Sequence, residues 1–237
     1  TAEAGLRLAE ECPPDLVVMD IHLPGMNGIE ALGELRAKEA TRSIPVLAFT
    51  ASVMPQDRHT ITSAGFDGFL SKPIAIKELE PVEGWPATHA SLVFKDQIGD
   101  HAGLQVSRLR DAGVVPVGMT TASEFGGLNI STTKLNGITG NAWDPTRTAG
   151  GSSSGSAAAV AGGLITLATG GDGGGSIRIP AGFTGIPGMK GTAGRIPRGP
   201  RTEIAPLTVV LGCLSRSIRD IARYYDVTAG FDSRDPY

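Results

Sequence analysis

Two glycine-rich segments of the sequence carry serines in a setting that is typical of a catalytic loop. The first, residues 150–156, reads Gly-Gly-Ser-Ser-Ser-Gly-Ser and precedes an alanine-rich run that predicts a helix. The second, residues 170–180, follows the apolar residues 164–168 and runs directly into Ile-Arg-Ile-Pro. Glycine and serine runs are usually flexible linkers, but linkers are not enclosed by apolar elements in this way. Because glycine permits positive φ and lets backbone N–H groups approach a ligand, we expect both segments to form a site.

The serines could take part in several kinds of chemistry. A phosphate-binding loop is one candidate, but neither segment continues with the Lys-Ser/Thr of a Walker loop. Residues 151–155 also match the G-x-S-x-G pattern of a nucleophile elbow, which requires a histidine later in the chain. All four histidines precede Ser153, which excludes a triad in that order; they are His22, His59, His89 and His101.

A serine nucleophile needs a base to accept its proton. Beyond residue 81 the lysines are Lys95, Lys134 and Lys190. A buried lysine can lose its charge through desolvation and then act as a base. Lys95 follows the apolar residues 91–94, which predict a strand, and is therefore the favoured candidate.

The first 80 residues have a different organisation. Apolar runs predict parallel strands at 15–20, 44–49 and 66–70, and helical patterns alternate with them at 29–37, 57–64 and 74–79. An open sheet of this kind places its site at the carboxyl ends of its strands. Three polar residues follow these ends, namely Asp20, Thr50 and Lys72. A carboxylate there can accept a phosphoryl group whose oxygens a hydroxyl and an ammonium bind.

The composition changes near residue 80. Six of the 33 glycines lie in residues 1–80, which carry 7 basic and 12 acidic side chains. Residues 81–86 contain two prolines and a glycine and break any regular element. We therefore predict two domains, residues 1–80 and 81–237, in a chain of the α/β class.

The overall composition indicates a soluble globular protein, with 41% hydrophobic and 19% charged residues. A net charge of −3 gives no reason to expect a nucleic acid or a membrane as partner. Cys12 and Cys213 are expected to be free thiols in a reducing cytoplasm. No signal peptide is recognisable, and the weakly polar residues 157–168 are too few to span a bilayer. We expect a cytoplasmic protein that acts on a small molecule.

The first domain closely resembles the receiver domain of bacterial response regulators. The similarity rests on residues 15–20, on Leu-Pro-Gly-Met-Asn-Gly at 23–28, on Thr50-Ala51 and on Lys72-Pro73. It implies that Asp20 is the phosphoacceptor, Thr50 the switch hydroxyl and Lys72 a phosphate contact. Receivers also bind Mg²⁺ through an acidic pair near their start, which this sequence does not include. We therefore expect a sheet without its central strand, a mainly structural role, and a need for Mg²⁺ only if the receiver functions.

Residues 91–237 resemble the amidase signature family. The matching segments are Lys95-Asp96, residues 117–125, residues 141–147, the two glycine-serine segments, residues 214–218 and residues 229–236. The resemblance implies a partial mixed sheet with flanking helices and a reaction that needs no metal or cofactor. Compared with the family, the stretch between Lys95 and Arg108 is shorter, and glycine replaces the common threonine at Gly171 and Gly173.

The resemblance also implies a role for each residue of the site. Ser176 would be the nucleophile, Ser152 the relay serine after a cis peptide bond from Gly151, and Lys95 the base. Backbone N–H groups would form an oxyanion hole, and two charged side chains would support its loop. The oxyanion hole comprises Gly173, Gly174, Gly175 and Ser176, and the supporting side chains are Asp172 and Arg178.

Three functions remain open at this point. The chain could be an amidase that hydrolyses a carboxamide C–N bond through an acyl-enzyme. It could instead be a signalling module that is controlled through phosphorylation of Asp20. Finally, it could be an inactive composite of two truncated domains. The proximity of Lys95, Ser152 and Ser176 in space would favour the amidase.

Overall fold

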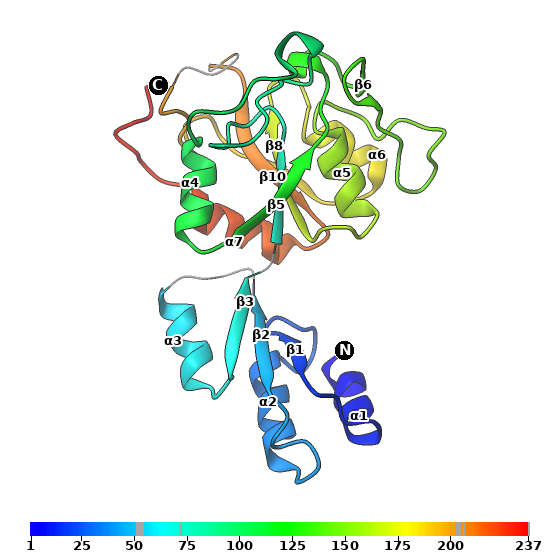
Figure 1. Ribbon diagram of the computed structural model, residues 1–237, viewed down its shortest axis with the longest axis vertical. Helices are drawn as coiled ribbons and strands as arrows, with labels where there is room; N and C mark the ends of the chain where they lie inside the picture. Colours follow the sequence, from blue (N-terminus) through cyan, green and yellow to red (C-terminus); the bar gives the residue numbers. More distant parts are fainter. Residues whose placement is uncertain (51–54, 72, 202–204, 206, 237) are drawn as a thin grey trace. The chain divides into compact units, whose positions relative to one another are not determined.

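The structure is a computed structural model that describes residues 1–50, 55–71, 73–201, 205 and 207–236. The chain forms two compact units, Thr1–Lys72 and Pro73–Tyr237 (Figure 1). The boundary precedes the break that the sequence predicts at residue 81. Each unit has its own sheet and its own core, so each is described separately.

The first unit contains a parallel three-stranded sheet with the order β1-β2-β3. Its strands are β1 (Val17–Asp20), β2 (Val46–Thr50) and β3 (Gly68–Ser71), and its helices are α1 (Ala2–Glu11), α2 (Gly28–Ala37) and α3 (Pro55–Ser63). The structure confirms the three predicted strands and two of the predicted helices, and adds α1. Asn27 begins α2 with a capping box, because its side chain accepts from Glu30 N while the Glu30 carboxylate accepts from Asn27 N.

A separate apolar core holds the first unit together. Leu6 of α1, Leu32 and Leu35 of α2, and Val46 and Ala48 of β2 are all buried in it. Alternate residues of β2 point into this core, as expected for a strand of period two. The fold of residues 1–71 is therefore the α/β arrangement that the sequence predicts.

The second unit is built on a mixed five-stranded sheet with the order β5-β4-β8-β10-β9. Its strands are β4 (Pro73–Lys77), β5 (Val115–Thr120), β8 (Leu167–Asp172), β9 (Gly188–Lys190) and β10 (Val210–Ser215). Strand β4 runs parallel to β5 and β8, whereas β10 is antiparallel to β8 and β9. A small antiparallel hairpin, β6 (Thr132–Thr133) and β7 (Gly137–Ile138), lies outside this sheet.

Strand β4 corrects the sequence prediction, which placed a helix at residues 74–79. Ile74, Ala75 and Ile76 are all buried, with Ile74 and Ile76 fully enclosed. A strand between two neighbours is covered on both faces and reads as a continuous apolar run, which does not distinguish it from a buried helical segment. Strand β4 therefore belongs to the second unit, and it ends at Lys77.

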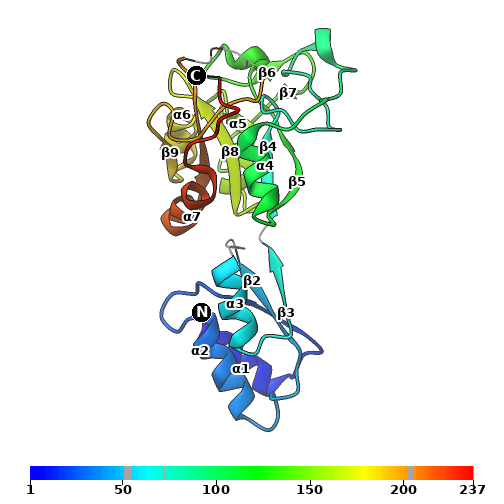
Figure 2. The ribbon, with the colours of Figure 1, turned by 90° about the vertical axis from the view of Figure 1, so that its left-hand side faces the viewer.

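Helices cover both faces of this sheet (Figures 1 and 2). Helices α5 (Ser154–Ala161) and α6 (Arg178–Thr184) pack on one face, and α4 (Leu104–Asp111) and α7 (Ile218–Thr228) pack on the other. Two short 3₁₀ helices, η1 (Leu92–Phe94) and η2 (Glu124–Gly126), lie in the connecting loops. No helix among the described residues is long and apolar enough to cross a membrane.

Candidate active site

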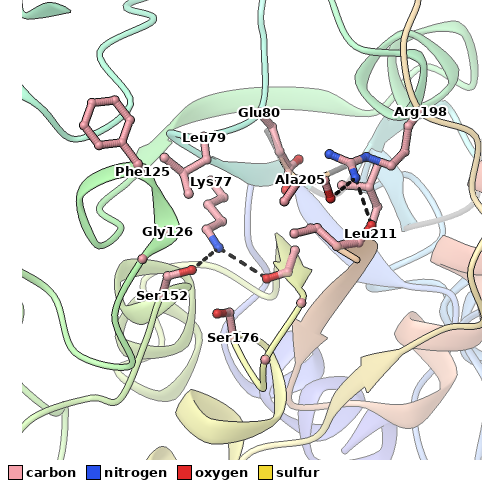
Figure 3. A pocket seen from close by; sticks show the side chains of 15 residues that line it. Lys77, Leu79, Glu80, Phe125, Gly126, Ser152, Ser176, Arg198, Ala205 and Leu211 are labelled. Carbon is pink, nitrogen blue, oxygen red and sulfur yellow. Dashed lines mark hydrogen bonds between the residues drawn. The ribbon is translucent and has the colours of Figure 1, made fainter. Parts of the chain in front are cut away.

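The end of β4 places a lysine in the middle of the second unit. Lys77 is 2% exposed, and its backbone N–H donates to Thr169 Oγ1 of the neighbouring strand β8 at 2.9 Å. Its Nζ donates to Ser152 Oγ at 2.8 Å and to the Gly171 carbonyl oxygen at 3.3 Å. Figure 3 shows this ammonium between the two glycine-rich loops. The sheet thus brings a lysine and a serine, 75 positions apart in sequence, into direct contact.

The first glycine-serine loop enters α5 and packs tightly against its surroundings. The peptide bond between Gly151 and Ser152 is cis, as the resemblance implied. A Cβ added at Gly155 would lie 2.4 Å from the backbone N of Thr121, so only glycine fits there. Ser156 Oγ donates to the Thr169 carbonyl oxygen at 2.8 Å. These contacts fix α5 on the sheet and hold the buried Ser152 below Lys77.

Lys95, the base that the sequence predicts, does not lie at this site. It follows the 3₁₀ helix η1 rather than a strand, its side chain is 55% exposed, and its ammonium pairs with Asp96. Lys77 occupies the position against Ser152 and replaces Lys95 as the candidate base.

The second glycine-rich loop is held by the Asp172–Arg178 pair that the sequence singled out. Nε and Nη2 of Arg178 each donate to one carboxylate oxygen of Asp172 at 2.9 Å. The same carboxylate accepts from the backbone N–H groups of Gly175, Ile177 and Arg178. Burial raises the pKa of Asp172, but these donors outweigh it and lower the pKa to about 2. The loop is therefore organised around an ionised carboxylate.

The backbone donors of this loop divide into two groups. Gly175 has φ 117°, a conformation that favours glycine, and its N–H donates to Asp172 at 2.8 Å. That bond removes Gly175 from the predicted oxyanion hole. The N–H groups of Gly173, Gly174 and Ser176 donate to no acceptor in the described part of the chain. These three N–H groups, called the glycine cradle below, remain able to bind an oxygen.

A cavity of about 260 Å³ connects these groups. Lys77, Ser152 and Ser176, which Figure 3 shows from close by, line it together with Gly173 and Gly174. Ser176 is linked to the first loop because its carbonyl oxygen accepts from Ser153 N at 3.1 Å. The remaining wall combines apolar and charged side chains, which include Leu79, Glu80, Phe125, Arg198, Val209 and Leu211.

The surroundings of Lys77 lower the pKa of its ammonium group. Burial lowers its pKa from 10.5 to about 8, and the carboxylates of Glu80, Asp172 and Glu78 oppose that decrease. A lysine with this pKa exchanges its proton near neutral pH, whereas an exposed lysine stays protonated. The amine is therefore able to accept a proton from the hydroxyl that it contacts.

The receiver-like residues lie at one edge of the first unit. Asp20 and Thr50 end the neighbouring strands β1 and β2, and Asp20 Oδ1 accepts from His22 N at 2.9 Å. Lys72, the predicted phosphate contact, lies outside the described residues. Within the described ranges, no group of three or more His, Cys, Asp or Glu residues could hold a metal ion. These residues do not fit a Mg²⁺ site, and we derive no phosphotransfer step from them.

Family models match both units of the chain. The model described as Amidase matches residues 62–237, and the model described as response regulator receiver domain matches residues 1–82. The two matches overlap over residues 62–82, the stretch in which the sequence prediction and the structure place the boundary differently.

Curated relatives are similar to more than half of the chain. A glutamyl-tRNA(Gln) amidotransferase subunit of Rhodopirellula baltica is 40% identical over 163 residues, which cover 69% of this chain and 33% of that protein. The subunit of the same name from Symbiobacterium thermophilum is 42% identical over 163 residues, with coverages of 69% and 33%. The chain thus spans about a third of the length of these relatives.

Solved structures are also similar to the chain. The corresponding glutamyl-tRNA(Gln) amidotransferase subunit from Thermotoga maritima has a TM-score of 0.64 at 32% identity, covering 70% of this chain and 36% of its own. A bacterial aryl acylamidase has a TM-score of 0.64 at 30% identity, with coverages of 76% and 39%. A 6-aminohexanoate cyclic dimer hydrolase complexed with substrate has a TM-score of 0.69 at 29% identity, with coverages of 100% and 48%.

Proposed function

The chain belongs to the amidase family, and from this premise we propose that it hydrolyses a carboxamide C–N bond with Ser176 as nucleophile, Ser152 as relay and Lys77 as base. One observation carries the proposal: the buried amine of Lys77 contacts Ser152 Oγ at 2.8 Å in the cavity that Ser176 also lines. A lysine and two serines can replace histidine as the route for a proton.

The proposed reaction begins with the neutral amine of Lys77. This amine accepts the proton of Ser152 while Ser152 accepts the proton of Ser176, whose oxygen attacks the substrate carbonyl carbon. The negative charge that develops on the carbonyl oxygen is stabilised by the glycine cradle, where each donor is worth about 3 kcal/mol. The low pKa of Lys77 supports this step, because burial makes the neutral form available.

Breakdown of the tetrahedral intermediate completes the first half of the reaction. The proton held by Lys77 passes through Ser152 to the nitrogen of the leaving amine, the C–N bond breaks, and an ester of Ser176 remains. Water then attacks this ester by the same proton route in reverse, which releases a carboxylic acid and restores Ser176. The proposed route uses only side chains and backbone groups of the chain together with water.

The substrate class proposed here is a small-molecule amide. The cavity of about 260 Å³ is lined in part by apolar side chains, among them Leu79, Phe125 and Leu211, which suit an acyl group of modest size. Relatives named as amidotransferase subunits and as an acylamidase agree in amide chemistry, although their names differ in substrate.

A turnover assay tests the proposal. Release of ammonia or amine from a panel of simple carboxamides and anilides is measured for wild type, Lys77→Met and Lys95→Met. We expect Lys77→Met to lose at least about a thousandfold in kcat, as expected for a lost base, and Lys95→Met to match wild type. Equal turnover by wild type and Lys77→Met, or loss of activity only in Lys95→Met, would refute the proposed proton route.

A further inference from the structure

The start of the second glycine-rich loop contains two glycines, which have no side chain that could hold the loop in place. Gly171 and Gly173 flank Asp172 at the end of β8. Asp172 anchors the distal part of the loop through Gly175, Ile177 and Arg178. The N–H of Gly173, which belongs to the cradle, has no such anchor.

A side chain from another segment occupies the free space. A Cβ added at Gly173 would lie 2.9 Å from Cγ2 of Val209, and one added at Gly171 would lie 3.2 Å from Cγ1 of Val209. The position of Val209 follows from the sheet, because Val210 of β10 pairs with Asp172 of β8. The two methyl groups of Val209 therefore pack on the backbone of the loop on either side of Asp172.

Val209 is in turn held by a buried arginine. Nη1 of Arg198 donates to the Val209 carbonyl oxygen at 2.9 Å and to the Ala205 carbonyl oxygen at 3.2 Å. Arg198 is 8% exposed, and its own backbone N–H donates to Asp235 at 3.1 Å. Figure 3 shows the guanidinium on the cavity wall beside Leu211. A planar guanidinium that binds two carbonyl oxygens fixes the backbone more firmly than a single bond would.

We propose that Val209, held by Arg198, is a positioning residue that keeps the glycine cradle aligned with the developing oxyanion. It touches neither Lys77 nor the serine hydroxyls in the contacts above, and acts on catalysis through the backbone of Gly173. The inference rests on the proposed function, because it assigns a support to the oxyanion hole of that reaction. Donors must point at the charge that develops in the transition state, so a small displacement has a large kinetic effect.

The test compares Val209→Ala with two matched variants of the same region. Val209→Ile keeps methyl groups over the glycines, and Leu207→Ala removes a side chain that is 81% exposed in the same segment. We expect Val209→Ala to lower kcat about tenfold, a fraction of the loss for a misplaced catalytic group, with KM changed less than about twofold. Leu207→Ala should stay close to wild type, and Val209→Ile should lose less activity than Val209→Ala.

Hydrogen exchange of the peptide 170–177 supplies a readout that does not depend on turnover. In Val209→Ala and in Arg198→Met, the amides of this peptide should exchange several times faster than in wild type. In Leu207→Ala their exchange rate should not change. An unchanged exchange rate in Val209→Ala would overturn the inference. So would a higher KM at unchanged kcat, because that pattern belongs to a substrate contact.

The two proposals fail in different ways. If the wild-type chain neither turns over an amide nor reacts at Ser176, the proposed function fails, and the exchange rates still decide whether Val209 holds the loop. If wild type is active and Val209→Ala equals it in kcat and exchange, only the positioning role is refuted.

Discussion

Replacing Lys77 by methionine should abolish activity and yet stabilise the second unit. Lys77 is 2% exposed, and burial lowers its pKa from 10.5 to about 8. Each pKa unit corresponds to about 1.4 kcal/mol, so the buried ammonium costs the folded state about 3 kcal/mol at neutral pH. Methionine removes this cost but leaves Ser152 Oγ and Gly171 O without a donor, which costs about 1 kcal/mol for each of the two acceptors. A net gain of about 1 kcal/mol remains.

The pH dependence of this gain identifies its cause. Below pH 8, Lys77 is protonated in both the folded and the unfolded state, so the folded state bears the whole cost. As the pH rises from about 8 to 10.5, the folded state releases its proton while the unfolded state keeps it, and the cost falls towards zero. The advantage of Lys77→Met over wild type should therefore be full at pH 6.5 and much smaller at pH 10.

Thermal unfolding followed by tryptophan fluorescence measures this effect. Trp85 and Trp143 are the two tryptophans of the chain, and both belong to the second unit, so the signal reports that unit. For a unit of this size, about 1 kcal/mol corresponds to a rise in Tm of about 2–4 °C at pH 6.5. Lys95→Met is the control, since the exposed pair of Lys95 with Asp96 should contribute less than about 1 kcal/mol. A lower Tm for Lys77→Met at pH 6.5, or a difference that does not shrink at pH 10, would refute the reasoning.

Four further predictions concern the same site. The pH–rate profile of kcat should rise with pH and level off above about 8, because the neutral amine of Lys77 is the reactive form. Glu80→Gln should move this rise to lower pH, since it removes the carboxylate that most strongly opposes the decrease in the pKa of Lys77; an unmoved profile would exclude that influence. Ser152→Ala should lower kcat by at least about a hundredfold by removing the proton relay, with near-wild-type far-UV circular dichroism; retained turnover would exclude the relay. Asp172→Asn should destabilise the second unit by about 3 kcal/mol in urea unfolding, because it weakens the hydrogen bonds that this buried carboxylate accepts from Arg178 and from the backbone; an unchanged midpoint would show that the loop does not depend on this carboxylate.

Much of the architecture could be predicted from local patterns. Short apolar runs that alternate with helical patterns gave the strands β1, β2 and β3, and the alanine run after Ser153 gave α5. Asp172 and Arg178 could be expected to support the loop, as the resemblance to the amidase signature family implies, whereas their direct ion pair is a finding of the structure. These features depend on residues close in sequence, for which spacing carries most of the information.

The position of the base could not be predicted in the same way. Residues 74–79 are apolar and short, and such a run fits a buried helix as well as a buried strand. A helix at 74–79 would place Lys77 in the first domain, apart from the serines of the second. The available signal was that Lys77 ends an apolar run, Ile74 to Ile76, and that this run directly follows Pro73. Only the pairing of β4 with β8 decides that this lysine faces Ser152.

The oxyanion hole was predicted too broadly for a related reason. Four consecutive N–H groups satisfy the glycine pattern equally well, but a carboxylate three residues away takes one of them. The contribution of Val209 depends on the register between β8 and β10, which links positions far apart in sequence. Long-range pairing of this kind leaves no local trace in a single sequence.

Reaction with a fluorophosphonate, followed by intact mass and peptide mapping, tests the central claim most directly. We expect wild type to gain one adduct on Ser176, Lys95→Met to react at the wild-type rate, and Lys77→Met to react far more slowly. Ser176→Ala should remain unlabelled. An adduct on another serine, or equal labelling of wild type and Lys77→Met, would contradict the proposed route from Ser176 through Ser152 to Lys77.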